Sequence, residues 1–330
     1  MVIQTKLTEI LGIKHPIVQG GMHYVGYAEM ASAVSNAGGL GIITGLTQPD
    51  PESLRKEIQK CKKMTDKPFG VNLTILPALI PADYDAYMNV ICSERVAVIE
   101  ITGGSPRKYM KQLKEAGVKV IHKSATIKHA LKAQADGVDI IEIAGCEGAI
   151  AGRSSKDDTG TWVILAKALN TLTTPVIVSG ASATGRQLAA AIAMGAHGIT
   201  MGTRFLCTKE CPIKTSIKER LVESSMSDTT LVLRSFNNST RVYKNDVARE
   251  ILRIEEEAQG DFSKIQHLAK GERGRVMFQE TGDWNDAMWS CGQSVGLIDD
   301  IPTCKELVER LVNEAATHLR KAAACTHSKL

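Results

Sequence analysis

"VAVIEITGGSPRKYMKQLKEAGVKVIHKSATIKHALKAQADGVDIIEIA", residues 96–144, contains three short apolar runs separated by two segments with helical periodicity. The runs at 96–102, 118–123 and 139–144 are continuously hydrophobic and do not alternate, which is typical of parallel strands covered on both faces. The two intervening segments both end in glycine, as helix C-termini prefer. The stretch therefore predicts strands that alternate with helices in a parallel sheet.

The same rhythm extends in both directions along the chain. Five further apolar runs lie at 15–19, 40–44, 69–74, 175–180 and 198–203. Eight strands in strict alternation with helices, over about 200 residues, are the pattern of a (β/α)8 TIM barrel. An open doubly wound sheet is the alternative fold, and the count of eight argues against it.

The rhythm changes after Phe205, which we take as the end of the barrel, residues 1–205. Residues 206–282 carry few strand runs and long charged helical patterns, such as "NDVAREILRIEEEAQG" at 245–260. We interpret them as a mainly helical appendage that covers the active site. Residues 283–330 form a C-terminal segment expected to pack back on the barrel, with a further helix from about Ile298.

Composition narrows the classes of partner. The chain has 330 residues, 43% hydrophobic and 23% charged, with a formal net charge of +4. No dense basic patch with interleaved aromatic residues supports nucleic-acid binding, so a small molecule is the expected partner. No apolar run reaches the roughly 18 residues that a membrane span needs, and the N-terminus lacks the pattern of a secretory signal. We expect a soluble intracellular protein.

The cysteines and the last three residues bear on the compartment. Eight cysteines are scattered without CxxC spacing, and Cys207 and Cys211 are the closest pair, so we expect reduced thiols and no metal site. The chain ends in Ser-Lys-Leu, an address read by the peroxisomal import receptor. We therefore expect a peroxisomal protein, with the cytoplasm as the alternative if the match is accidental.

The carboxyl ends of the predicted strands should hold the ligand, as they do in barrels of this kind. These ends read "VQGGMHYVG", "VNLT", "HKS", "GCEGAIAGR", "SGAS" and "MGTRF" in chain order. Their glycines allow a backbone to lie close to a flat or phosphorylated ligand, and the last two offer amide donors where barrels commonly hold a phosphate. Gln19 and Asn72 add neutral donors. Lys123 adds a cation that would stabilise negative charge on a reduced ring.

Five motifs resemble the nitronate monooxygenase (2-nitropropane dioxygenase) family of FMN-dependent barrels, and most closely its NADH:quinone reductase branch. They are "PIVQGGM" (16–22), "FGVNLT" (69–74), "VIHK" (120–123), "MGTRFLCTKEC" (201–211) and "WSCGQSVGLID" (289–299). The resemblance runs in unbroken order from Lys14 to Leu307. It implies the TIM barrel, a non-covalent FMN, transient NADH or NADPH, a quinone or nitronate substrate, and an appendage forming the second wall of the substrate cleft. A homodimer is also open.

The resemblance also implies which residues hold the cofactor. Phosphate contacts fall on Gly180, Gly202 and Thr203, with Ala181 where the family has a second glycine. An alanine there can still offer its amide if its φ is negative. The ring contacts are Gly21, Met22, Asn72 and Lys123, with Gln19 and Gly20 in the same rim.

One loop departs from the family. In "GCEGAIAGRSSKDDTG", residues 145–160, Ala151 stands where the family usually has the histidine of a Gly-His pair, and two residues are inserted before the paired aspartates. This loop has no group titrating near neutral pH that would serve as a general base. A nitronate that arrives deprotonated, or a hydride from NAD(P)H, needs no base for the first step. Glu147, Arg153 and His23 are candidate substitutes for the histidine, and Lys123 and Glu147 are the catalytic candidates.

Several of these residues also have purely structural interpretations. Gly20 and Gly21 would then make a tight turn, Glu147 would anchor its loop, Arg153 and the aspartates after it would be solvated, and His122 would point away from the site because it alternates with Lys123. Trp284 and Trp289 would be core residues of the appendage. Lys123 would be an ordinary lysine at a strand end.

Three functional hypotheses remain open at this point. They are an FMN-dependent oxidoreductase, a flavin enzyme without net redox turnover such as an isomerase or lyase, and a degenerate barrel that only binds. A yellow protein would exclude the third. Anaerobic bleaching by NADH or NADPH would favour a reductase, and bleaching only by a nitronate would favour the monooxygenase.

Overall fold

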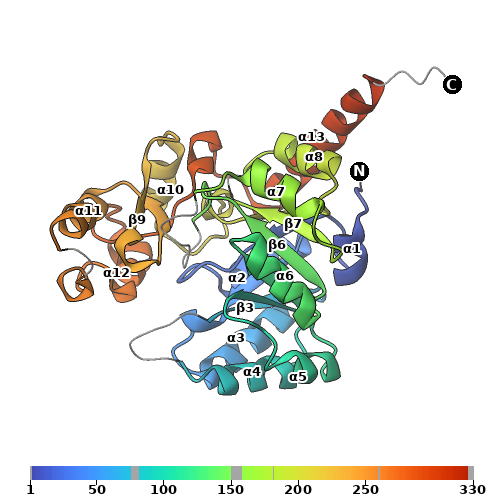
Figure 1. Ribbon diagram of the computed structural model, residues 1–330, viewed down its shortest axis with the longest axis horizontal. Helices are drawn as coiled ribbons and strands as arrows, with labels where there is room; N and C mark the ends of the chain where they lie inside the picture. Colours follow the sequence, from blue (N-terminus) through green and yellow to red (C-terminus); the bar gives the residue numbers. More distant parts are fainter. Residues whose placement is uncertain (1, 76–81, 150–157, 181, 259–260, 326–330) are drawn as a thin grey trace.

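Eight parallel strands follow one another around a nearly closed barrel, with helices on its outside, in the computed structural model, which describes residues 2–75, 82–149, 158–180, 182–258 and 261–325 (Figure 1). The strands are β1 (Ile17–Gln19), β2 (Gly41–Thr44), β3 (Phe69–Ile75), β4 (Val98–Gly103), β5 (Lys119–Ser124), β6 (Ile140–Ala144), β7 (Val176–Ser179) and β8 (Ile199–Met201). Each predicted apolar run overlaps one of them, and β3, β4 and β5 extend one residue beyond their runs. The predicted TIM barrel is confirmed.

The helices between the strands begin and end where local chemistry dictates. They are α1 (Lys6–Leu11), α2 (Ala28–Asn36), α3 (Pro51–Met64), α4 (Tyr84–Ser93), α5 (Met110–Glu115), α6 (Ile127–Asp136), α7 (Thr161–Leu169) and α8 (Gly185–Met194). The hydroxyl of Thr126 accepts a hydrogen bond from the amide of His129 and so caps α6. The same helix ends at Gly137, whose φ of +82° suits glycine.

Two layers of buried apolar side chains position the strands. The larger cluster lies between the strands and the outer helices. The smaller one fills the barrel interior and includes Leu7 and Leu11 of α1, which close the amino-terminal end. Its strand members are Val18, Leu40, Ile42, Val98, Ile121, Ile140 and Ile177. Because alternate residues of a strand share a face, the residues two positions further along point into the barrel above this layer.

The seam of the barrel lies between β1 and β2, which pair only through a bridge of Val18 with Leu40. Gln19 supplements this pairing with its own side chain. Its backbone amide donates to the carbonyl of Leu40 at 2.9 Å, and its side-chain Oε1 accepts from the backbone amide of Ile42 at 3.0 Å. A polar side chain thus stands in for ladder hydrogen bonds that the seam lacks.

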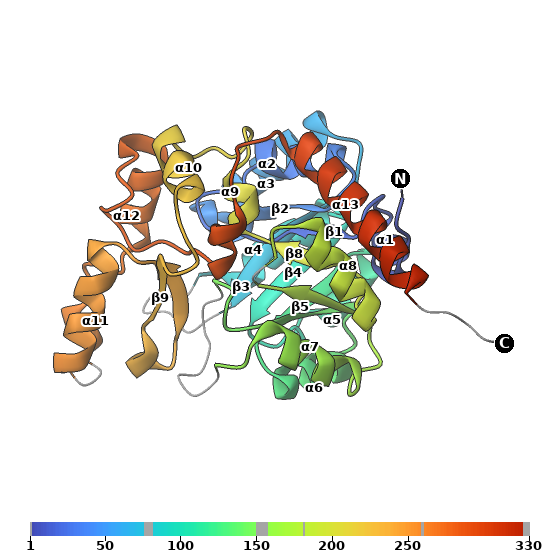
Figure 2. The ribbon, with the colours of Figure 1, turned by 90° about the horizontal axis from the view of Figure 1, so that it is seen from above.

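The appendage lies at the end of the barrel where the strands finish, on the left of Figures 1 and 2. The barrel ends in α9 (Thr203–Leu206), and the elements of the appendage are α10 (Thr215–Val222), β9 (Thr229–Val232), β10 (Thr240–Tyr243), α11 (Asp246–Ala258) and α12 (Gly271–Val276), followed by a π-helix over Met277–Thr281. Residues 283–290 stay with the appendage, since Ser290 forms a bridge with Val242 of β10. The antiparallel pair β9–β10 was not singled out from the sequence. It packs with α11 on a small core of its own that includes Val232, Val242 and Ile251.

The C-terminal segment returns to the barrel through α13 (Cys304–Ala324), which packs along α8. The carboxylate of Glu314 accepts a hydrogen bond from the amide of Gly185 at 2.8 Å, at the start of α8. Buried Arg204 holds the approach to α13, because its guanidinium lies 3.1 Å from Asp300 and donates to the carbonyls of Cys207 and Asp300. Among the described helices, none combines the length and apolar character that a membrane crossing requires.

Candidate active site

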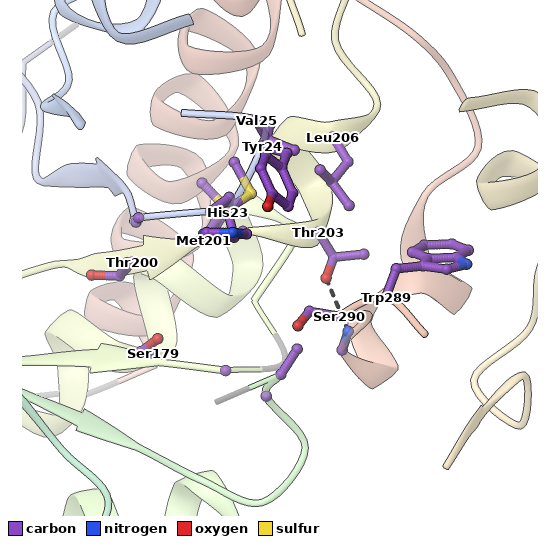
Figure 3. Close-up of a pocket in the computed structure, with 18 of the residues that line it drawn as sticks. His23, Tyr24, Val25, Ser179, Thr200, Met201, Thr203, Leu206, Trp289 and Ser290 are labelled. Atoms are coloured by element: carbon purple, nitrogen blue, oxygen red, sulfur yellow. Dashed lines mark hydrogen bonds between the residues drawn. The ribbon is translucent and has the colours of Figure 1, made fainter. Parts of the chain in front are cut away.

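A cavity opens where the carboxyl ends of the strands meet the appendage (Figure 3). Its empty space is about 1200 Å³, part of it open to solvent. Because that figure includes open solvent, the volume to compare with ligand pockets of about 300–1000 Å³ is the cavity's own, about 290 Å³, which is close to the smaller of them. The barrel contributes residues 20–25, 148–149, 179–180 and 200–203, and the appendage contributes Ala269, Gly271, Gly274, Phe278, Met288 and Trp289.

The floor of this cavity is a cluster of three charged side chains, Glu100, Lys123 and Glu142, from neighbouring strands β4, β5 and β6. The Nζ of Lys123 lies 2.8 Å from Oε1 of Glu100 and 3.1 Å from Oε1 of Glu142. Both carboxylates are fully buried, whereas the lysine is 10% exposed and lines the cavity. We call these three residues the floor cluster. They stand two positions beyond the apolar interior residues Val98, Ile121 and Ile140 of the same strands.

Neutral groups hold the two carboxylates in place. Oε2 of Glu100 accepts from the amide of Gly21 at 3.0 Å and from the side-chain amide of Asn72 at 2.8 Å. Oε2 of Glu142 accepts from the hydroxyl of Thr200 at 3.0 Å. The two Oε1 atoms receive no hydrogen bond of good geometry among the described residues, so their contact with the ammonium is one of charge alone.

Burial and charge act in opposite directions on the floor cluster. Burial lowers the pKa of Lys123, but the two carboxylates outweigh it and the net pKa is raised. Burial raises the pKa of Glu100, but Lys123 and the Gly21 amide hold it below its ordinary value. For Glu142 burial prevails and raises the pKa to about 7, because Lys123 is shared and Glu100 repels a second negative charge.

The rim offers backbone amides without partners. Within the described part of the chain, the amides of Gly180, Gly202 and Thr203 donate to no carbonyl or side chain. Gly180 has a φ of +86°, and a Cβ added to Gly148 would lie 2.7 Å from the Cα of Gly180. These two glycines thus let two backbone loops touch at the cavity wall. Free amides beside such a cradle are suited to an anion such as phosphate.

The loop after β1 forms the opposite wall of the cavity. A Cβ on Gly21 would lie 2.4 Å from the Cβ of Asn72, so only glycine fits above the floor at this position. Tyr24 has a φ of 59°, a strained conformation for a bulky residue and one that clusters at functional sites. Met22 and Tyr24 both line the cavity, and Figure 3 shows the Tyr24 ring there.

His23 is an imidazole that this loop directs to the cavity (Figure 3). A Cβ added to Gly271 of α12 would lie 3.7 Å from its Nε2, so the ring lies between the barrel and the appendage. Surrounding protein atoms lower the pKa of His23 to about 4, although the ring remains open to the cavity. His23 is therefore neutral at neutral pH and can accept a proton.

The roof of the cavity comes from the appendage and is mainly apolar. We define it as Phe278, Met288 and Trp289, together with Ala269 and Gly274. Trp289 stacks on Tyr243 with ring centroids 4.6 Å apart and planes 7° apart. Trp289 is thus both a core residue and a wall of the cavity, whereas Trp284 packs on Tyr243 beneath the guanidinium of Arg220.

The structure brings most of the predicted cofactor residues to this cavity. Those that line it are Gly20, Gly21, Met22, Lys123, Gly180, Gly202 and Thr203. Gln19 and Asn72 are not among these lining residues: the Gln19 side chain bonds the backbone at the barrel seam, and the Asn72 side chain bonds Glu100. Ala151, Arg153 and Ala181 lie outside the described residues.

Glu147 has a structural role in its loop. Its carboxylate accepts hydrogen bonds from the amide and the hydroxyl of Thr161, at 2.9 Å and 2.8 Å, and so anchors the loop to the start of α7. These bonds occupy the group predicted as a catalytic candidate. His122 points away from the cavity, as alternation predicts, and its ring nitrogens contact Ser124 and the carbonyl of Gly104.

Glu100 and Glu142 were missed by the sequence analysis. Each is the lone charged residue inside an apolar stretch, "VAVIEIT" at 96–102 and "IIEIA" at 140–144. A single carboxylate at an inward position is the available signal, because a buried charge must be paired. The lysine that pairs with both was recognised, and its partners were not.

Comparison with known proteins agrees with this geometry. A family model described as nitronate monooxygenase matches residues 4–314. The "(3aS,4S,5R,7aS)-5-hydroxy-7a-methyl-1-oxo-octahydro-1H-indene-4-carboxyl-CoA dehydrogenase" of Mycobacterium tuberculosis is 32% identical over 98% of this chain and 99% of its own length.

Solved structures extend the likeness to three dimensions. FabK from Thermotoga maritima is 34% identical, with a TM-score of 0.90 over 98% of this chain and 100% of its own. A nitroalkane oxidase from Streptomyces ansochromogenes is 26% identical, with a TM-score of 0.83 over 96% of this chain and 100% of its own. From the barrel, its glycine-rich rim and these matches, we conclude that the chain belongs to the nitronate monooxygenase family of oxidoreductases.

Proposed function

We propose that this chain is an FMN-dependent oxidoreductase that takes electrons from NADH or NADPH and reduces an electron-poor substrate, such as a quinone, in the cleft between barrel and appendage. The observation that carries the proposal is the position of three unpartnered amides beside a glycine cradle, in the same cavity that Lys123 of the floor cluster lines. The family membership supports it.

The residues present fit a phosphorylated flat cofactor. The amides of Gly180, Gly202 and Thr203 would hold the phosphate, and Ser182 adds a hydroxyl on the same wall. Gly20, Gly21 and Met22 leave space for a ring against the first strand end, above Lys123. Bound FMN would accept two electrons from a hydride donor and pass them to a second substrate.

The side chains around the cleft divide the remaining tasks. The roof excludes water and offers apolar contact to a substrate ring. His23 supplies an imidazole from the β1 loop, where the family's histidine would have come from the loop after β6. A neutral imidazole can take a proton from a substrate carbon, or donate its N–H as a hydrogen bond to a substrate oxygen.

Oxidation of small nitronates is the second activity that we retain from the sequence. The likeness to a nitroalkane oxidase supports it. A third substrate class, CoA thioesters of alicyclic acids, is favoured by the dehydrogenase relative that spans the whole chain. The mainly apolar roof suits such a ring. If the chain were an isomerase, a lyase or a binding module without turnover, NADH and NADPH would not reduce its flavin.

An anaerobic stopped-flow experiment on the purified protein tests the proposal. The flavin content is first measured by absorbance and identified after release. NADH and NADPH are then mixed with the protein, and the reduced form is mixed with a quinone, a nitronate or an alicyclic CoA thioester. Fast bleaching followed by fast reoxidation by one substrate class supports the proposal. Protein that holds flavin but is bleached by neither nucleotide contradicts it.

We also propose that the terminal Ser-Lys-Leu directs this enzyme to peroxisomes; these residues lie outside the described ranges. A fluorescent fusion at the N-terminus should gather in peroxisomes, and deletion of residues 328–330 should release it to the cytoplasm. Identical distributions of the two fusions would exclude this signal.

A further inference from the structure

The floor cluster contains more negative than positive side chains, and its carboxylates have no access to water. One ammonium, Lys123, faces two carboxylates, Glu100 and Glu142, and both carboxylates are fully buried. If both were ionised, the cluster would carry a net charge of −1 without a counterion. A buried unpaired charge costs several kcal/mol in a protein interior, so binding of a proton is the available compensation.

The geometry identifies where this proton resides. Glu100 accepts two good hydrogen bonds, from Gly21 and Asn72, which favour its ionised form. Glu142 accepts one from Thr200 and has the hydroxyl of Ser179 beside it, and the Oε1 atoms of both carboxylates receive no hydrogen bond of good geometry. Both Oε1 atoms lie against the same Nζ, at 2.8 Å for Glu100 and 3.1 Å for Glu142, so the two carboxyl groups are neighbours. A proton on Glu142 would thus satisfy an orphaned oxygen and leave Glu100 paired with Lys123.

We propose that Glu142 is the group in the floor cluster that binds one exchangeable proton, and that it binds this proton more completely, taking it from water, when the ligand above Lys123 gains negative charge. The inference rests on the proposed function for the second half of that statement. The electrons enter the ligand from the hydride of NADH or NADPH, and the proton enters from solvent through the cavity, so no further reactant is needed. Lys123 faces the cavity and lies 3.1 Å from Glu142. It therefore couples the charge on the ligand electrostatically to the protonation of Glu142.

The surroundings of Glu142 leave few other groups to titrate. The charged groups that face it from β4 and β5 are Glu100 and Lys123. The strands β7 and β8 present the neutral hydroxyls of Ser179 and Thr200, and β3 presents the neutral amide of Asn72. His23 and Tyr24 lie on the same cavity and are neutral at neutral pH. The raised pKa of Glu142, about 7, is consistent with this assignment.

Infrared difference spectroscopy of the purified protein, with and without its flavin, tests the first half. A band of protonated carboxyl groups should appear below about pH 7 in the wild type and be absent in Glu142→Gln. Glutamine mimics the protonated side chain, so this variant should fold. Glu57→Gln is the matched control, because Glu57 is a largely buried carboxylate on α3 that accepts from the amide of Ala28 outside the barrel interior. The band should persist in it.

Thr200→Val gives a second measurement that does not depend on Glu142→Gln. It removes a hydrogen bond to the ionised carboxylate, so the band should persist to higher pH than in the wild type. A wild-type band that does not titrate between pH 5 and 9, or one that remains in Glu142→Gln, overturns the assignment. A band that keeps its midpoint in Thr200→Val does the same.

Proton uptake on reduction tests the second half. In weakly buffered solution near pH 7.5 with an indicator dye, the wild type should take up more protons per two electrons than Glu142→Gln, when both are reduced photochemically. Equal uptake, with flavin bound in both, overturns the coupling and leaves the proposed function standing. A protein that binds no flavin but shows the titrating band would instead contradict the proposed function and support the proton on Glu142.

Discussion

The floor of the cavity is formed by barrel strands and holds three charged side chains almost without access to water, whereas the roof is formed by the appendage and presents mainly apolar side chains. Floor residues are bound to one another by hydrogen bonds and ion contacts across five strands. Roof residues contribute surface and shape. The contrast indicates that the floor governs the charge state of a bound cofactor and the roof governs which substrates enter. Five substitutions in four experiments test this division, from the largest expected effect to the smallest.

Removal of the central cation should affect the floor most. Lys123→Ala leaves two buried carboxylates without a counterion, and breaking such a pair typically costs about 3–5 kcal/mol. The remaining carboxyl groups then have raised pKa values in the folded state, so their protonation stabilises the variant at low pH and this stabilisation is lost as the pH rises. Urea unfolding should show a larger loss at pH 8 than at pH 5, together with weaker flavin binding.

Lys119→Ala is the control for this experiment. Lys119 lies on the same strand, but its contact with Asp139 at 3.3 Å is on the surface and the side chain is 47% exposed. Surface pairs contribute about 0–1 kcal/mol, so the control should lose little stability. Equal losses in the two variants, or unchanged flavin content and turnover in Lys123→Ala, would show that the floor cluster is not held by its central cation.

His23 lies between floor and roof, and its replacement should affect rate rather than stability. We expect His23→Gln to slow turnover by about 100-fold, at the lower end of general acid–base contributions. In the wild type the neutral imidazole prevails above its pKa of about 4, so the rate should fall only as the pH drops through that value. His129→Gln, which replaces an exposed histidine of α6, should change neither the turnover rate nor its dependence on pH. A wild-type rate profile that falls near pH 6.5 would contradict the assignment.

Two glycines of the rim, Gly21 after β1 and Gly202 after β8, allow steric fit to be distinguished from contact with the cofactor. Gly21→Ala forces a Cβ into Asn72, and overpacking of this kind usually costs about 1–3 kcal/mol. Gly202→Ala meets only the flexible side chain of Met22, at 3.5 Å from the sulfur and 3.8 Å from Cγ, so its fold should be retained. Thermal unfolding and flavin content measured side by side should show both falling in Gly21→Ala and only flavin content changing in Gly202→Ala. If Gly21→Ala keeps its full stability, the side chain of Asn72 moves aside without cost and the floor is not rigid at this position.

The smallest effect is expected at the roof. Met288 is partly buried and lines the cavity, so Met288→Ala should remove about 1 kcal/mol of apolar contact and raise the KM of an apolar substrate about fivefold. The hydride transfer from NADH or NADPH should be unchanged, because the floor is intact. An effect on flavin reduction larger than that on KM would remove the distinction between floor and roof.

The barrel itself was predictable, because its signals are local. Continuous apolar runs and terminal glycines such as Gly117 and Gly137 appear within a few residues of one another, and they located each of the eight strands to within about two residues of its observed limits. The rim glycines were predictable for a related reason. Their lack of a side chain matters wherever they stand, and the strand ends meet at one end of any parallel barrel.

The partners of those residues were decided only by the tertiary structure. Gln19 and Asn72 read as ligands in the sequence, but the open seam and the buried Glu100 engage their side chains. Glu100 and Glu142 read as interruptions of apolar runs, yet strand register brings both against Lys123. Periodicity states which face a side chain takes, whereas register and barrel closure determine which faces meet. The charge balance of the floor, and with it the proton on Glu142, follows from that meeting.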